Sequence, residues 1–340
     1  MRRNLSVRFS ALGLALSLTL CAALCVALVA LSPGAYAADK YVFILKRIGN
    51  PYWQAIKQGI EDGGKEAGIS LTVLSPNNDQ AKEEHLNLCE AAISQKPAIV
   101  VLGAATTAIG LQCFREAQKQ GIKVADIDAT ISVAQAKKSG VNLSFTIGAD
   151  NTMIGRRAAQ FIAGTSVSAM KTSRAAKVLI LEGVVGSPPS TDRVAGFKEE
   201  LAKVLPQAKI VASTSAEWDR LRALNITADT LTKTPDLNAV FAANDVMALG
   251  AVEAIRAAGK TNQIIVVGVD GVPDARKAIL AGRMTASITQ LPYLIGKRSV
   301  ELATKSVRGE CSGRTERAPL LILTKSVLES KKDPLLQNLR

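Results

Sequence analysis

The sequence predicts an α/β protein made of two similar domains, each with a parallel sheet that helices cover on both faces. Short, almost continuously apolar segments alternate with amphipathic ones, which is typical of buried parallel strands joined by helices. Residues 98–128 and 239–270 also resemble each other. Each runs strand, turn, helix, a glycine near the helix end, and a second strand that ends in Asp128 or Asp270.

Five strands are expected in each half of the chain. Those of the first half are residues 41–46, 69–75, 98–103, 123–128 and 145–150, and those of the second half are residues 177–183, 209–214, 239–244, 264–270 and 285–290. Asn50 and Pro51 follow the first strand as a good N-cap and a good first helical residue. The segment after them places Trp53, Ile56 and Ile60 on one helical face.

The first 37 residues have the pattern of an export signal. A basic start with Arg2, Arg3 and Arg8 precedes an apolar run, residues 11–31, and then a small-residue cleavage motif at Ala35–Ala37. We expect cleavage after about Ala37 and a periplasmic location. The alternative is an uncleaved anchor, because the apolar run is long enough to span a bilayer. Leucines precede Cys21 and Cys25 where a lipidation signal needs small residues, so lipidation is not expected.

The charge of the exported chain does not indicate a nucleic-acid partner. Loss of the three signal arginines lowers the formal net charge from +13 to +10, with 39 basic residues against 29 acidic ones. A positive charge of this size can attract nucleic acid. Here the lysines and arginines are scattered among acidic residues along the helices and form no basic run. We therefore interpret them as solvated surface residues.

Three cysteines remain after the signal, namely Cys89, Cys113 and Cys311. They form no CxxC or Cys/His ligand pattern, so neither a metal site nor a cofactor is expected. Exported proteins can keep disulfides. Cys89 and Cys113 lie on consecutive expected helices that could share one face of a sheet, and we predict a disulfide between them. The alternative is two separate buried thiols.

Polar and aromatic residues gather where the expected strands end. In open parallel sheets, ligands bind beyond the carboxyl ends of the strands. Those positions hold amides, carboxylates, a cation and an aromatic ring: Lys46, Asn50, Trp53, Asp128, Asn244, Asp245, Asp270 and Gln290. A sugar hydroxyl both donates and accepts hydrogen bonds, and a sugar ring has apolar faces that aromatic rings can cover. The set therefore predicts a site for a neutral sugar or polyol between the two domains.

Several longer segments resemble a known family. The stretches "LKRIGNPYWQAIKQGIED", "VADIDATI", "STDRVAGFKEEL", "AEWDRLRAL", "FAANDVMALGAVEAI", "VVGVDGVPDARKAI" and "GRMTASITQLP" look like the periplasmic pentose- and hexose-binding proteins of ABC transporters. The resemblance covers essentially the whole exported chain and is strongest to the allose- and ribose-binding type. It implies the type I periplasmic binding protein fold, with two Rossmann-like domains joined by a hinge of several chain crossings.

This resemblance, with boundaries at residues 148–152 and 290–293, gives the expected domains. Residues 1–37 are the signal peptide. One lobe comprises residues 38–148 with about 291–320, and the other comprises residues 149–290 with about 321–340.

The resemblance also implies the sugar contacts. They are Lys46, Asn50, Trp53, Asp128, Arg193, Trp218, Asn244, Asp270 and Gln290, with Tyr52 as a neighbour. Trp53 and Trp218, the only tryptophans in the chain, would sandwich the sugar. Two features depart from the family pattern. Ala129 follows Asp128 where ribose-binding relatives have arginine, and Pro188 with Pro189 could reshape one end of the pocket.

Each of these residues has a plainer interpretation. Asn244 could be only a helix N-cap, and Asp245 is better explained that way than as a ligand contact. The tryptophans could be ordinary core residues. Lys46 and Arg193 could be solvated, and Gln290 could bridge backbone between the domains. His85, the only histidine, is expected on the polar side of a helix and receives no function.

The sequence favours a binding protein over an enzyme. It has neither glycine-rich nucleotide motif, and its single histidine is expected to lie away from the cleft. Asp128 and Asp270 could in principle hydrolyse a glycoside, but they are better interpreted as hydroxyl acceptors. We expect a monomeric receptor that binds an allose-, ribose- or psicose-like monosaccharide and delivers it to a membrane ABC permease. The alternative is a sensory protein that presents a sugar-like signal to a membrane receptor. A related DNA-binding repressor would carry a helix-turn-helix where this chain has an export signal.

Overall fold

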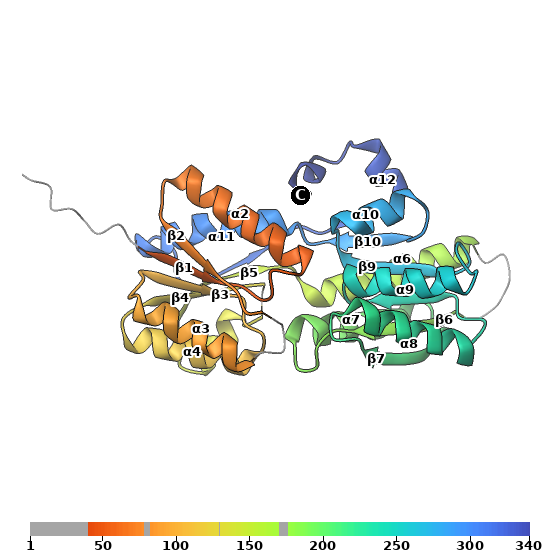
Figure 1. Cartoon of the computed structure of the whole chain (residues 1–340), viewed down its shortest axis with the longest axis horizontal. Coiled ribbons are helices and arrows are strands. Elements are labelled where there is room, and N and C mark those ends of the chain that lie inside the picture. The colour runs from red at the N-terminus through yellow and green to blue at the C-terminus, as the bar shows by residue number, and fades with distance from the viewer. Residues whose placement is uncertain (1–39, 78–81, 129, 170–175) are drawn as a thin grey trace, which may run out of the picture. The chain divides into compact units, whose positions relative to one another are not determined.

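The computed structural model describes residues 40–77, 82–128, 130–169 and 176–340. The expected export signal and Ala129 lie outside these ranges. The described residues contain two six-stranded sheets with helices on both faces, which confirms the α/β class (Figure 1). None of the described helices has the length and apolar character needed to cross a membrane.

The first sheet has the strand order β11-β5-β4-β3-β1-β2. Its strands are all parallel to their neighbours. In chain order they are β1 (Tyr41–Ile44), β2 (Leu71–Leu74), β3 (Ile99–Leu102), β4 (Lys123–Ile127), β5 (Leu143–Gly148) and β11 (Arg314–Arg317).

The second sheet has the matching order β12-β10-β9-β8-β6-β7. Only its edge strand β12 is antiparallel to its neighbour, β10. In chain order the strands are β6 (Lys177–Glu182), β7 (Lys209–Ser215), β8 (Ala239–Ala242), β9 (Ile265–Asp270), β10 (Ala286–Thr289) and β12 (Leu321–Leu323).

All ten expected strands form, and the two sixth strands, β11 and β12, are additional to the prediction. The sequence of β11, Arg-Thr-Glu-Arg on an exposed edge, lacks the apolar run that identified the others. The sequence of β12, Leu-Ile-Leu, is apolar, but the strand has only three residues.

Helices cover both faces of the first sheet. On one face lie α2 (Pro51–Ala67) and α11 (Pro292–Val307), and on the other lie α3 (Lys82–Ser94), α4 (Thr107–Lys119) and α5 (Val133–Lys138). Alternate strand residues point to opposite faces. Phe43 therefore packs in the core under α2 and α11, whereas Val42 packs in the core under α3 and α4.

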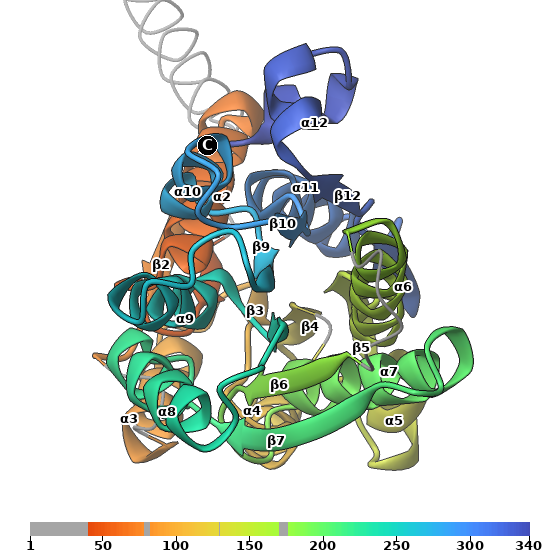
Figure 2. The ribbon, with the colours of Figure 1, turned by 90° about the vertical axis from the view of Figure 1, so that its right-hand side faces the viewer.

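The second sheet is covered in the same way (Figure 2). The helices α6 (Asn151–Ala169) and α7 (Pro188–Val204) lie on one face. The other face carries α8 (Arg220–Lys233), α9 (Asp245–Ala257) and α10 (Pro273–Leu280). Two final elements are α12 (Lys325–Ser330) and the 3₁₀-helix η1 (Pro334–Asn338). Their residues Val327 and Leu336 pack against the hydrophobic core under α8, α9 and α10.

The chain passes between the sheets three times. It leaves the first sheet after β5, returns between β10 and α11, and leaves again between β11 and β12. The return is a tight turn in which Leu291 has a φ of 53° and the Thr289 hydroxyl accepts a hydrogen bond from its amide at 3.1 Å. Two of the three crossings are those that the sequence placed at residues 148–152 and 290–293.

The position of His85 corrects the sequence analysis. His85 is only 2% exposed and lies on the inward face of α3, in line with the buried Cys89, Ala92 and Ile93. Burial lowers the pKa of the imidazole to about 4, and the charge of Lys46 adds to this effect. The interpretation as a surface residue was wrong because a polar residue type was taken to mark the outer face of a weakly amphipathic helix.

The neutral, buried His85 makes stability depend on pH. In the unfolded chain the pKa is about 6.5, above the folded value, so protons bind the unfolded state more strongly. The contribution to stability is complete above pH 6.5 and is lost as the pH falls toward 4, by about 3 kcal/mol. A His85→Leu variant should lose less stability than the wild type between pH 6.5 and 4 in urea unfolding. Parallel pH profiles for the two proteins would contradict this assignment.

Cys89 and Cys113 form a disulfide between α3 and α4, as predicted. Cys311 is a free cysteine. The disulfide closes a loop of 24 residues and so restricts the unfolded chain.

Replacement of both Cys89 and Cys113 with alanine should lower the free energy of unfolding by about 3 kcal/mol, as expected for a loop of this length. The measurement is chemical denaturation of the oxidised protein, with Cys311→Ala as the matched control that should change little. Dithiothreitol should lower the midpoint of the wild type but not of the double variant. Equal midpoints for both proteins without reductant would show that the disulfide does not stabilise the fold.

Candidate functional site

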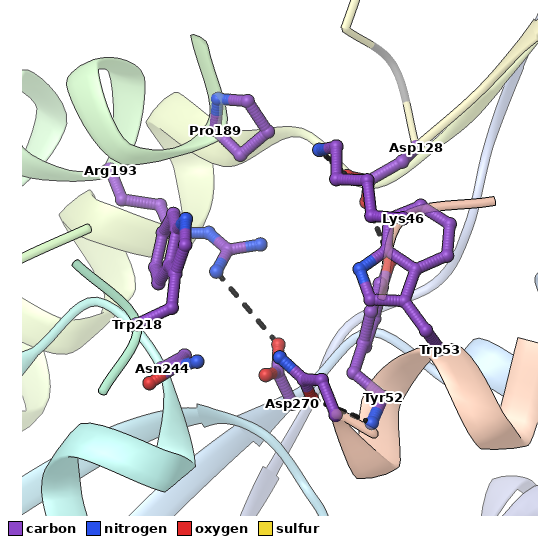
Figure 3. A pocket seen from close by; sticks show the side chains of 10 residues that line it. Lys46, Tyr52, Trp53, Asp128, Pro189, Arg193, Trp218, Asn244 and Asp270 are labelled. Carbon is purple, nitrogen blue, oxygen red and sulfur yellow. Dashed lines mark hydrogen bonds and ion pairs between the residues drawn. The ribbon is translucent and has the colours of Figure 1, made fainter. Parts of the chain in front are cut away.

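A pocket lies at the carboxyl ends of the strands of both sheets (Figure 3). Its empty space, which includes space open to solvent, has a volume of about 370 Å³. Five of the lining residues come from the first sheet with its helices and loops, and five come from the second sheet with its own. They are Lys46, Asn50, Tyr52, Trp53 and Asp128 from the first, and Pro189, Arg193, Trp218, Asn244 and Asp270 from the second.

The first turn of α2 positions two aromatic residues of the pocket, Tyr52 and Trp53. Asn50 is the N-cap, and its side-chain oxygen accepts a hydrogen bond from the Tyr52 amide at 3.0 Å. Pro51 begins the helix, as predicted. Tyr52 and Trp53 follow at once and are each 4% exposed, with their rings edge to face at 5.4 Å. The Asn-Pro start of the helix therefore brings both rings to the end of β1.

Lys46, Tyr52 and Asp128 form one hydrogen-bonded group. The Lys46 ammonium lies 3.1 Å from Asp128 Oδ2, and the Tyr52 hydroxyl donates to Asp128 Oδ1 at 2.7 Å. The same ammonium lies 5.2 Å from the centre of the Trp53 ring, within range of a cation–π contact. Burial raises the pKa of Tyr52 well above its usual value, and the negative charge of Asp128 adds to the rise. Tyr52 is therefore a neutral hydrogen-bond donor at physiological pH.

Arg193 and Asp270 are the charged residues that the second half of the pocket contributes. The Arg193 guanidinium donates to Asn151 Oδ1 at 2.8 Å and to the Ala243 carbonyl at 2.6 Å, and it lies 3.8 Å from Asp270 Oδ1. Gln290 donates to the same Asp270 oxygen at 2.7 Å. Burial raises the pKa of Asp270 well above its usual range, although the positive charge of Arg193 opposes this rise.

Each tryptophan of the pocket lies against a glycine that follows a central strand. A Cβ atom on Gly103, after β3, would lie 2.7 Å from Trp53 Cη2. A Cβ atom on Gly183, after β6, would lie 2.0 Å from Trp218 Cζ2. Both distances are far below a van der Waals contact. The two glycines therefore create the space in which the aromatic rings lie.

Three pocket residues have unusual backbone conformations. Asp128, Trp218 and Asp270 have φ angles of 81°, 62° and 118°, although none is a glycine. Positive φ is uncommon for such residues and costs of the order of 1–3 kcal/mol each. Strain of this kind gathers at functional sites, where the surrounding structure enforces it. The pocket therefore carries a conformational cost that packing alone does not explain.

The charges of the pocket balance. Lys46 and Arg193 are cationic, Asp128 and Asp270 are acidic, and each sheet contributes one of each kind. A buried charge needs a partner because its transfer from water is costly. A neutral ligand keeps this balance, whereas a charged ligand would disturb it. Within the described residues no group of three His, Cys, Asp or Glu side chains is arranged to hold a metal ion.

Most residues singled out from the sequence come together here. Eight of the nine line the pocket, and Gln290 lies behind Asp270 and binds it. Asn244 also serves as the N-cap of α9, because its side-chain oxygen accepts from the Met247 amide at 2.9 Å. Pro189 lines the pocket as well.

The comparisons with known proteins agree with this fold. Residues 41–311 match the family model of the periplasmic binding protein domain. The chain belongs to the periplasmic binding protein family. A similar protein of this family is the D-allose-binding periplasmic protein of Escherichia coli (strain K12), which is 33% identical over 301 residues, 88% of this chain and 94% of that protein. The ribose import binding protein of the same strain is 34% identical over 286 residues, 84% of this chain and 90% of that protein.

Solved structures of transporter solute binding proteins share the fold. A periplasmic solute binding protein from Actinobacillus succinogenes, with bound D-allose, is 29% identical with a TM-score of 0.77. The match covers 86% of this chain and 99% of that one. A carbohydrate transporter solute binding protein from Agrobacterium radiobacter, in complex with D-arabinose, is 25% identical with a TM-score of 0.81 and coverages of 90% and 99%.

Two buried carboxylates, Asp245 and Asp126, hold the segments that follow the pocket aspartates, and the sequence did not reveal this role. Asp245 was interpreted as a helix cap, but it accepts hydrogen bonds from the Gly271 and Val272 amides at 2.7 and 2.9 Å and from the Ser287 hydroxyl. It thereby fixes the turn that follows Asp270. Burial raises its pKa to about 7.

Asp126 plays the corresponding part in the first sheet of this periplasmic binding protein. It accepts from the Thr146 hydroxyl at 2.8 Å and from the Ile131 amide at 3.1 Å, in the segment that follows Asp128. Burial raises its pKa well above the usual value. A sequence signal existed for Asp126, because a carboxylate inside a buried apolar strand needs hydrogen-bond donors.

Gly183→Ala should displace Trp218, because the added methyl group would occupy the place of the ring. We expect a loss of about 1–3 kcal/mol in the free energy of unfolding, as for other overpacked sites, and a changed tryptophan emission spectrum. Gly164→Ala in α6 is the matched control, since its Cβ would meet no described atom within 4 Å. An unchanged spectrum and unchanged stability in Gly183→Ala would show that the ring can move without cost.

Proposed function

We propose that this protein captures a neutral monosaccharide in the pocket between its two sheets and delivers it to an ABC transporter permease. The observation that carries the proposal is the composition of the pocket. It combines two tryptophans, two carboxylates, two cations and two amides, one of each kind from each half of the pocket, and its charges balance.

The side chains suit the hydrogen bonding of a sugar. Asp128 and Asp270 accept from hydroxyl groups, and Lys46, Arg193 and the Asn244 amide donate to them. The rings of Trp53 and Trp218 supply flat apolar surfaces for the two faces of a sugar ring. A wrongly placed hydroxyl would leave a buried polar group unpaired, at a cost of about 1–3 kcal/mol, so such a site distinguishes epimers.

Gln290 supports the proposal from behind the pocket. It is buried, and its side-chain oxygen has no hydrogen-bond partner among the described residues, although its nitrogen binds Asp270. Buried polar atoms rarely stay unpaired. A ligand hydroxyl or an ordered water that reached this oxygen would satisfy it.

The similar proteins favour a pentose or hexose as the ligand. The names of these proteins and the molecules bound to them include allose, ribose and arabinose. We propose that the ligand of this chain is of the same class, an allose-, ribose- or psicose-like sugar. Pro189, which lines the pocket, would adjust which epimer fits.

The proposed mechanism is capture by closure. Each sheet with its helices would act as one lobe, and the three crossings would form the hinge. The boundaries are those expected from the sequence, residues 38–148 with about 291–320 and residues 149–290 with about 321–340. A sugar that contacts both halves of the pocket would favour the closed state, because only that state offers all the contacts.

We further infer export to the periplasm with cleavage near Ala37, action as a monomer, and binding without chemical change of the sugar. The family is named for periplasmic proteins, and its similar members are sugar-binding transport proteins. On this proposal Asp128 and Asp270 accept sugar hydroxyls and do not act as the acid and base of a glycosidase.

A thermal-shift screen of residues 38–340 against aldohexoses, ketohexoses, pentoses and polyols tests the proposal. A ligand present at 100 times its dissociation constant adds about 2.7 kcal/mol to stability and visibly raises the midpoint. We expect one strong response within the pentoses or hexoses. No response from any sugar at millimolar concentration would contradict the proposed function.

Asp270→Asn should weaken binding of the responding sugar at least 100-fold, because the replacement removes a charged acceptor while keeping the shape. Folding should survive or improve. Burial raises the pKa of Asp270, so the charged group destabilises the fold as the pH rises above its unfolded pKa, and asparagine removes that cost. The measurements are isothermal titration calorimetry and the thermal midpoint.

The matched control is Asp274→Asn. Asp274 is exposed on α10, four residues further along, where it pairs with Lys277. Its replacement should leave the affinity unchanged. Micromolar binding retained by Asp270→Asn would remove Asp270 from the site.

A further inference from the structure

We propose that the Tyr52 hydroxyl is a specificity-determining group of this pocket. It fixes how many hydrogen bonds Asp128 can accept from sugar hydroxyls, and from which direction. The inference rests on the proposed function and deepens it. Its basis is the hydrogen bond of 2.7 Å between Tyr52 Oη and Asp128 Oδ1, inside the pocket lining.

The direction of this hydrogen bond is fixed by chemistry. Tyr52 is buried and its pKa is raised well above the usual value, so the phenol keeps its proton. A phenol has one proton, and here Asp128 accepts it. The Tyr52 oxygen can therefore only accept a hydrogen bond from a ligand. A sugar hydroxyl at this corner of the pocket must donate.

The same bond limits Asp128. A carboxylate has about four acceptor positions, two on each oxygen. Tyr52 takes one on Oδ1 and the Lys46 ammonium takes one on Oδ2. One position on each oxygen remains for the ligand. Without the Tyr52 hydroxyl, Oδ1 would offer two positions and would tolerate more than one arrangement of sugar hydroxyls.

The hydroxyl also holds the carboxylate in place. Asp128 follows β4 in a strained backbone conformation, with a φ of 81°, and its two oxygens are bound by groups from two different segments, the end of β1 and the first turn of α2. Removal of the Tyr52 bond leaves Lys46 as the side chain that orients Asp128. Tyr52 therefore narrows the set of sugars that find matched partners.

The test is Tyr52→Phe, which keeps the ring against Trp53 and removes only the hydroxyl. Isothermal titration calorimetry compares the wild type and the variant with the sugar found in the screen and with each of its monodeoxy derivatives. We expect the parent sugar to lose about tenfold in affinity. One derivative, lacking the hydroxyl that donates at this corner, should change by less than twofold, so that discrimination between it and the parent collapses. This is a double-mutant cycle between protein and ligand.

Tyr293→Phe is the matched control. Tyr293 is also buried, but its hydroxyl donates to Asp62 at 3.1 Å and the residue does not line the pocket. Its loss should leave the order of affinities unchanged. The thermal midpoint of each variant checks its folding.

The outcomes separate this inference from the proposed function. A uniform loss of affinity for the parent and all derivatives would overturn the inference, because it would indicate a purely structural role. Unchanged affinities in Tyr52→Phe would overturn it as well. A wild-type protein that binds no sugar at all would overturn the proposed function, and this inference with it.

Discussion

The balance of four buried charges constrains the rest of this structure. Lys46 with Asp128 and Arg193 with Asp270 lie where strands of the two sheets end, in positions that water reaches poorly. Unpaired charges there would be very costly, and pairing recovers the cost only when further hydrogen bonds satisfy the remaining atoms. Tyr52, Gln290, Asn151 and the Ala243 carbonyl provide those bonds. Much of the local structure around the pocket serves this purpose.

Support for the charged groups is built in the same way in both sheets. A buried aspartate, Asp126 or Asp245, accepts hydrogen bonds from backbone amides of the segment that follows the pocket aspartate and from a hydroxyl of the neighbouring strand. A glycine, Gly103 or Gly183, makes room for a tryptophan. The faint sequence repeat between the two halves thus corresponds to a repeated way of building one half of a binding site. A sugar between them would meet two similar but not identical surfaces.

The sequence predicted ten of the twelve described strands and most of the pocket because these features follow from local patterns. Apolar runs mark buried strands, and polar residues at their ends mark the edge where ligands bind. It did not predict β11 and β12, whose pairing depends on distant partners, nor the burial of His85, which depends on packing. The hydrogen bond from Tyr52 to Asp128 joins residues 76 positions apart, and only the folded chain shows it. Positive φ at Asp128 and Asp270 has no sequence signature of the kind that glycine gives.

The three crossings have a consequence for how such proteins can be recombined. Neither sheet is built from one continuous stretch of sequence, because α11 and β11 return to the first sheet after the whole central part of the second has been made. A chimera joined once, at about residue 148, would combine strands of two parents within a single sheet. Exchange of a complete half of the pocket between two relatives requires three junctions, one at each crossing. A single recombination event therefore cannot transfer a complete half of the pocket from one relative to another. Point substitutions at the strand ends are a more direct way to change the ligand preference.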